Sequence, residues 1–160
     1  MLKTDIPMQP QENEILQRSY QSGWHDLIQF LFNQVISDSQ DSEAHEKLRQ
    51  IGAAIAARHP LPPCDSIAAL EACLNDLLGH FDWGFVRIAP ARHELILVHC
   101  AWPHTPTQGE NAQWRLASAC MLAGAYGEWI SAQGGRNEVT TNWHAKDTDD
   151  VLIFRYALHA

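Results

Sequence analysis

The stretch "AQWRLASACMLAGAYGEWISAQ", from Ala112 to Gln133, decides how the rest of this chain must fold. It carries only two charged residues, Arg115 and Glu128, among 22. Wound as a helix, it places apolar or small side chains on every side, and such a helix has to be covered on every side. A sheet of the same chain can cover one side. The remaining cover comes either from other parts of the same chain, which makes this a central helix, or from neighbouring copies.

Three helices are predicted before this stretch from apolar residues that recur at spacings of three and four. The first has the stripe Leu16, Tyr20, Trp24, Leu27, Leu31 and Val35. The second has one face formed by Leu48, Ile51, Gly52 and Ile55. The third is capped by Asp65 or Ser66 and has the face Ile67, Leu70, Leu74, Leu77, Leu78 and Phe81.

The segment "ARHPLPPCDS", Ala57 to Ser66, joins the second and third helices. Its three prolines cannot continue a helix, because each lacks a backbone N–H and restricts the residue before it. Cys64 at the next helix entrance has two interpretations. It is a small side chain that plugs the joint, which we favour, or a nucleophile activated by the helix dipole and His59.

Beyond "DWG", residues 82–84, the pattern changes to β-branched apolar runs. The runs "FVRIA" (Phe85–Ala89) and "ELILVHC" (Glu94–Cys100) predict an antiparallel hairpin. The segments Glu138–Trp143 and Val151–Leu158 predict a second strand pair. Segregated helices and hairpins indicate an α+β fold with an antiparallel sheet. We expect a single domain over residues 1–160, with residues 1–11 as a flexible arm.

Composition excludes several classes of function. The formal net charge of −8 disfavours binding to nucleic acid or to anionic membranes, which need dense Lys and Arg. Between Arg115 and Glu128 there are 12 uncharged residues, fewer than the about 20 of a membrane span. The first residues have no apolar core of the secretory kind. Four cysteines without a C-x-x-C pair indicate reduced thiols, so a cytoplasmic location is expected.

No motif commits the chain to catalysis or to a metal. There is no G-x-S-x-G, no phosphate-binding glycine loop and no H-E-x-x-H, so no catalytic residue and no cofactor is assigned. Nine histidines suggest metal binding, but His99 and Cys100 are adjacent on a strand and point to opposite faces. We therefore predict no metal site. The alternative retained is a cytoplasmic ligand- or metal-sensing domain that uses the region from His99 to His104.

Self-association is the interaction that the pattern favours. The apolar faces of the second and the long helix include glycines that permit close approach of another helix. The candidate interface residues are Gly52, Ile55, Gly124, Tyr126, Gly127 and Trp129. Of the six tryptophans, Trp83, Trp114 and Trp129 are assigned to the core, and the surface candidates are Trp24, Trp102 and Trp143.

Several short motifs occur in an order that resembles a known family. They are "LRQIG" (Leu48–Gly52), "PPC" (Pro62–Cys64), "LNDLL" with "WG" (Leu74–Leu78, Trp83–Gly84), "LVH" (Leu97–His99) and "GAYGEWISAQGG" (Gly124–Gly135). Together, from about Leu48 to Ala160, they resemble the family of D subunits encoded by bacterial cellulose synthase operons. The Y-G-x-W-x-x-x-Q-G core, Tyr126 to Gly134, is the most specific part.

The resemblance implies a non-catalytic accessory protein of cellulose secretion. Members assemble as octamers, four dimers in a hollow cylinder, which favours ordered alignment of synthase complexes or of emerging glucan chains. The implied partners are further copies of the chain, the synthase complex at the inner membrane, another accessory protein and β-1,4-glucan. The family has also been discussed as periplasmic. By position alone, the candidates for a glucan passage are Met1, Leu2, Lys3, Thr4, Asp5 and Ile6.

Overall fold

The structure is a computed structural model that describes residues 27–28, 30–35, 41–102, 111–134, 140–144 and 151–157. Its named elements follow in chain order: α2 (Asp41–Arg58), α3 (Ile67–His80), β1 (Phe85–Pro90), β2 (Glu94–Cys100), α4 (Asn111–Ala132), β3 (Thr140–His144) and β4 (Val151–Ala157). Residues 27–28 and 30–35 are also helical. The predicted α+β class is confirmed. The arm at residues 1–11, with its glucan-passage candidates, lies outside the described residues.

The four strands form one antiparallel sheet in the order β1-β2-β4-β3. Both predicted hairpins are present, and β2 joins them by pairing with β4. One face of this sheet is buried: the row Val86–His99–Leu152 and the row Ile88–Leu97–Phe154 run across β1, β2 and β4. Side chains alternate between the two faces of a strand, so the intervening rows face the other side.

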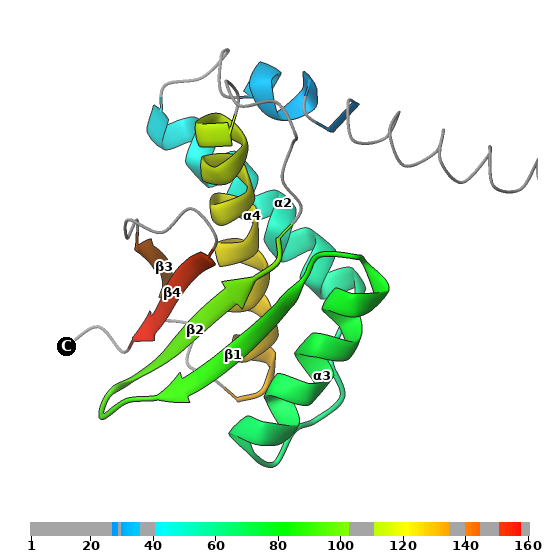
Figure 1. Ribbon diagram of the computed structural model, residues 1–160, viewed down its shortest axis with the longest axis vertical. Helices are drawn as coiled ribbons and strands as arrows, with labels where there is room; N and C mark the ends of the chain where they lie inside the picture. Colours follow the sequence, from blue (N-terminus) through cyan, green and yellow to red (C-terminus); the bar gives the residue numbers. More distant parts are fainter. Residues whose placement is uncertain are drawn as a thin grey trace, which may run out of the picture.

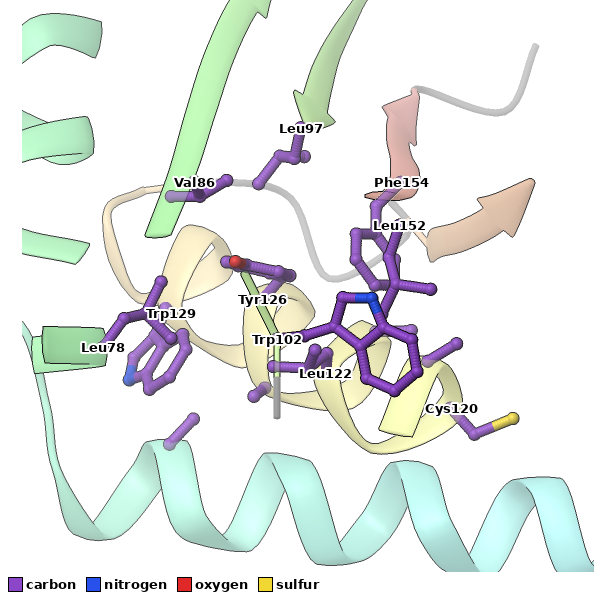
Figure 2. Close-up of a cluster of buried hydrophobic side chains, with 14 of the residues drawn as sticks. Leu78, Val86, Leu97, Trp102, Cys120, Leu122, Tyr126, Trp129, Leu152 and Phe154 are labelled. Carbon is purple, nitrogen blue, oxygen red and sulfur yellow. The ribbon is translucent and has the colours of Figure 1, made fainter. Parts of the chain in front are cut away.

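The helix α4 is covered from several directions by the same chain. It packs against β3 and β4, while α2 runs alongside it, and α3 packs against β1 (Figure 1). Figure 2 shows Tyr126 on α4 together with Val86 and Leu97 of the sheet, and Trp129 on the side of Leu78 of α3. Of the two alternatives, cover within one chain is therefore correct for most of this helix.

Two glycines let α2 and α4 touch through their backbones. A Cβ built on Gly52 would lie 1.8 Å from the carbonyl oxygen of Met121, and one on Gly124 would lie 1.9 Å from that of Arg49. No side chain fits at either position. These glycines, predicted to serve an interface between copies, make a contact between two helices of one chain.

The third helix begins where its sequence signal placed it. The Ser66 hydroxyl oxygen accepts a hydrogen bond from the Ala69 N–H at 3.2 Å, so Ser66, and not Asp65, is the cap. Its buried side chains are Leu70, Leu74 and Leu78. Ile67, at the helix start, is 36% exposed.

Two predictions about buried residues are wrong. Leu27 and Leu31 of the predicted first stripe are exposed, whereas Phe32 is buried, with its ring centroid 5.1 Å from that of Trp114. Trp102, predicted at the surface, is also buried. The preceding Ala101 has φ 54°, a left-handed conformation that turns the chain after β2. Alanine seldom adopts this conformation, so the sequence does not predict the turn. Trp24 and Trp143 lie among residues whose side chains are not described.

The close helix contact gives a direct test. Gly52→Ala should lower the free energy of unfolding by about 1–3 kcal/mol, because the new methyl group forces α2 away from α4. Gly79→Ala is the matched control, since a Cβ there meets nothing within 4 Å and alanine is favoured over glycine in a helix by about 1 kcal/mol. Urea unfolding at equal protein concentration measures both. Equal stability of the two variants would contradict the backbone contact.

Candidate functional site

The residues of the Tyr126–Gly134 motif lie at the end of α4 where the sheet, the α3–β1 turn and the proline joint meet. Tyr126 is fully buried and faces His99, which lies in the middle of an otherwise apolar sheet row. The Tyr126 hydroxyl is 2.5 Å from Nδ1 of His99, and the backbone oxygen of Trp83 is 2.6 Å from Nε2. Both imidazole nitrogens are therefore occupied.

The partners of His99 determine its tautomer. A backbone carbonyl only accepts, so Nε2 carries the proton and donates it to Trp83. In the neutral ring Nδ1 is then an acceptor, and the Tyr126 hydroxyl donates to it. Burial lowers the pKa of His99 to about 4, because the charged form would lose its hydration, while the Trp83 carbonyl opposes this shift. Burial likewise raises the pKa of Tyr126. The pair is neutral at physiological pH.

The turn that presents the Trp83 carbonyl depends on Gly84. Gly84 has φ 85°, and a Cβ on it would lie 2.2 Å from the carbonyl oxygen of Cys100. The position therefore excludes other residues both by conformation and by space. The "WG" pair of the sequence holds the hydrogen-bond acceptor for His99 in place.

The other polar members of the motif bind the proline joint. The Trp129 indole Nε1 donates to the carbonyl of His59 at 3.0 Å. The Gln133 amide donates to the carbonyl of Pro62 at 3.1 Å and accepts from the N–H of Cys64 at 2.8 Å. Gly134, with φ 93°, ends the helix in the left-handed conformation that glycine favours. The motif thus fastens α4 to residues about 70 positions earlier in the chain.

The joint itself agrees with the favoured interpretation of Cys64. Cys64 as a residue is half-buried, and its Sγ lies 3.3 Å from the carbonyl oxygen of Pro62. Burial raises the pKa of Cys64, with Cys73 and Asp65 adding to the effect. A raised pKa lowers the fraction of reactive thiolate. The ring of His59 packs edge-on against Phe81, with centroids 5.0 Å apart.

The alternative function, a ligand- or metal-sensing domain, loses His99 as its main candidate for a ligating side chain. Both nitrogens of His99 are used within the core, and His104 lies outside the described residues. In the described ranges, no three His, Cys, Asp or Glu side chains come together as metal ligands would. Across those same residues, no helix combines the length and the apolar character needed to cross a bilayer.

The predicted interface residues have partners inside the chain. Gly52, Tyr126 and Trp129 are buried, and Gly124 contacts the backbone of Arg49. Ile55 and Gly127 are half-buried. A single chain does not test contacts between copies, but the reason for choosing these residues, an uncovered helix, no longer applies.

The sequence reasoning missed an exposed apolar patch, formed by Leu27, Ile28, Phe30 and Leu31 and called here the 27–31 patch. Phe30 is 75% exposed and Leu31 55%. The helical spacing places these side chains next to one another. The signal was present in "LIQFLFNQV", residues 27–35, which contains no charged residue and too many apolar ones for a single stripe.

The buried His99 predicts a dependence of stability on pH. Unfolded His99 binds a proton below its ordinary pKa of about 6.5, whereas the folded group binds one only below about 4. Between these values the unfolded state holds more protons, so lowering the pH from 6.5 to 4 should lower the free energy of unfolding by about 3 kcal/mol through this group.

Unfolding of the protein and of His99→Gln over that pH range isolates the effect, because glutamine does not titrate. The variant should be less stable at pH 7 and should lose less stability on acidification. Parallel pH profiles for the two proteins would refute the assignment of a neutral, buried His99.

Comparison with known proteins shows the family of this chain. Residues 13–157 match the family model that describes the D subunit of cellulose synthase. The chain is 34% identical over 131 residues to a cellulose synthase operon protein D of Komagataeibacter xylinus, covering 76% of this chain and 83% of the relative. The protein of the same name from Komagataeibacter sucrofermentans matches with the same identity and coverage. The chain therefore belongs to the cellulose synthase D-subunit family, a family of accessory proteins of cellulose synthesis.

Proposed function

We propose that this protein is a non-catalytic scaffold of bacterial cellulose secretion that acts by assembling with further copies of itself. Dimers and an octamer built from four dimers are the forms proposed. Repeated copies hold synthase complexes, or the glucan chains that emerge from them, in register, so that neighbouring chains crystallise. The synthase complex at the inner membrane and a further accessory protein are the proposed partners, and direct contact with β-1,4-glucan is proposed for residues 1–6.

The observation that carries the proposal is the 27–31 patch. Among the residues that the structure describes, one cluster contains the buried apolar side chains of α2, α3, α4 and the sheet. Four large apolar side chains nevertheless remain exposed on the helix at residues 27–35, which Phe32 anchors to Trp114. Exposed apolar groups of this kind mark interaction sites.

Charge favours another protein copy as the occupant of this patch. Each chain has a net charge of −8, so two copies repel one another wherever acidic surfaces meet. Residues 27–35 contain no charge at all. A membrane surface would instead require Lys and Arg beside the apolar residues. The patch is therefore suited to contact between copies.

The chemical groups of the described residues support a structural role. His99, Tyr126, Trp129 and Gln133 all use their polar atoms to connect elements of the fold. Free thiols at all four cysteines suit a reducing compartment, which supports the proposed cytoplasmic location over the periplasmic one.

Phe30→Ser tests the proposed contact. Loss of the most exposed apolar side chain should raise the dissociation constant of the assembly by about 10-fold or more and shift native mass spectra toward smaller species. Ile67→Ser is the matched control, because it removes an exposed apolar residue of α3 and should leave the assembly unchanged. Circular dichroism should show both variants folded.

The same variants test the role in the cell. A strain that carries Phe30→Ser at normal protein level should produce less crystalline cellulose than one that carries Ile67→Ser. A wild-type protein that stays monomeric at micromolar concentration, or unaltered crystallinity after deletion of the gene, would overturn the scaffold proposal.

A further inference from the structure

The two edge strands of the sheet, β1 and β3, differ in what lies against their outward-facing backbone groups. At β1, side chains of α3 occupy the backbone groups that face away from β2. The Asn75 amide donates to the carbonyl of Val86 at 2.9 Å and accepts from its N–H at 2.7 Å. The Glu71 carboxylate accepts from the N–H of Ile88 at 2.6 Å. These three bonds occupy both backbone groups of Val86 and the N–H of Ile88, which a further strand would need for pairing, so the β1 edge is closed at these residues.

The opposite edge is formed by β3. Among the strands that the structure describes, β3 has one neighbour, β4. In an antiparallel strand, alternate residues direct their N–H and C=O groups away from the neighbour, so β3 presents such groups along its outer edge. Its sequence, "TTNWH", contains no proline, lysine or acidic residue, the usual devices that protect an edge.

We propose that the β3 edge is an interaction site for β3 of a second copy, which adds in antiparallel orientation about a two-fold axis at Asn142. This inference rests on the proposed function only in requiring self-association. Strand addition supplies main-chain hydrogen bonds across the two copies and joins two four-stranded sheets into one of eight.

The closed β1 edge is the reason for choosing β3 as the partner. Pairing of β3 with β1 of the next copy would be head-to-tail and would continue without end. Asn75 and Glu71 prevent it. Pairing of β3 with β3 uses the same segment on both copies, so it closes at two. The five residues of β3 carry no formal charge at neutral pH, so no like charges meet in this register.

The register of the sheet supplies a matched pair of test positions. Ala89 pairs with Ile96, Ile96 with Arg155, and Arg155 with Asn142. Ala89 and Asn142 therefore stand at opposite ends of one row, on β1 and β3. Arg155, in this row, alternates with the buried residues of β4, so substitutions at either end avoid the core.

Cysteine cross-linking tests proximity. In the proposed register the two Asn142 Cα atoms lie about 4.5–5.5 Å apart, within the range that a disulfide spans. Mild oxidation of Asn142→Cys should give a covalent dimer in the full chain. Ala89→Cys and the wild type, which share the four native thiols, should give no more than background. Equal dimer yields from the two variants would overturn the proposal.

Lysine substitutions at the same two positions provide the second test. Asn142→Lys places like charges opposite each other on the axis and should halve the mass of the largest assembly in native mass spectrometry. Ala89→Lys, on the closed edge, should leave the mass unchanged. If Phe30→Ser reduces the mass while Asn142→Lys does not, the β3 contact is wrong and the scaffold proposal survives. If the wild type is monomeric, both fail.

Discussion

The structure depends on one constraint: α4 has no polar face, so each of its sides has to be covered. The sheet covers one side through β3 and β4, and α2 covers another. The second contact is as close as backbones allow, because Gly52 and Gly124 leave room for the carbonyl groups of Met121 and Arg49. Apolar burial provides the stabilisation, and the two glycines determine where the helices meet.

The Tyr126–Gly134 motif extends this arrangement with directional bonds. Tyr126 connects α4 to the sheet through His99, and His99 continues to the turn before β1 through Trp83. Trp129 and Gln133 connect the end of α4 to the proline joint. The side chains of His99, Tyr126 and Trp129 are buried, so their bonds satisfy polar groups that would otherwise lack a partner, at a cost of about 1–3 kcal/mol apiece. The most specific residues of the family pattern in this chain therefore stabilise the fold, and the surfaces proposed for assembly lie elsewhere.

Much of the fold could be predicted from periodicity. The helices, both hairpins and the start of the third helix at Asp65 or Ser66 follow from spacing and from local chemistry. The joining of β2 to β4 could not be predicted, because two hairpins in sequence do not specify which strands become neighbours. Trp102 was misplaced because the left-handed Ala101 has no local signal. Gly52 and Gly124 were identified correctly as sites of close approach, but the sequence did not show that each helix was the partner of the other.

The candidate site was predicted less well than the fold. An apolar helix has the same sequence pattern whether its cover comes from its own chain or from another copy, so Tyr126 and Trp129 were assigned to an interface. Two members of the 27–31 patch, Leu27 and Leu31, were assigned to the apolar stripe of the first helix, because periodicity identifies an apolar face and does not identify what covers it. A structure was needed to separate residues that complete the core from those that remain for a partner.

Hydrogen exchange along α4 tests the central claim, that a single chain covers this helix. The measurement compares the assembled protein with the Phe30→Ser chain at a concentration where it has dissociated. The account predicts that backbone amides between Trp114 and Ile130 keep their protection on dissociation, within about 10-fold, because their cover is intramolecular. An acceleration of about 100-fold or more, confined to dissociated chains, would show that neighbouring copies cover α4 and would contradict the account.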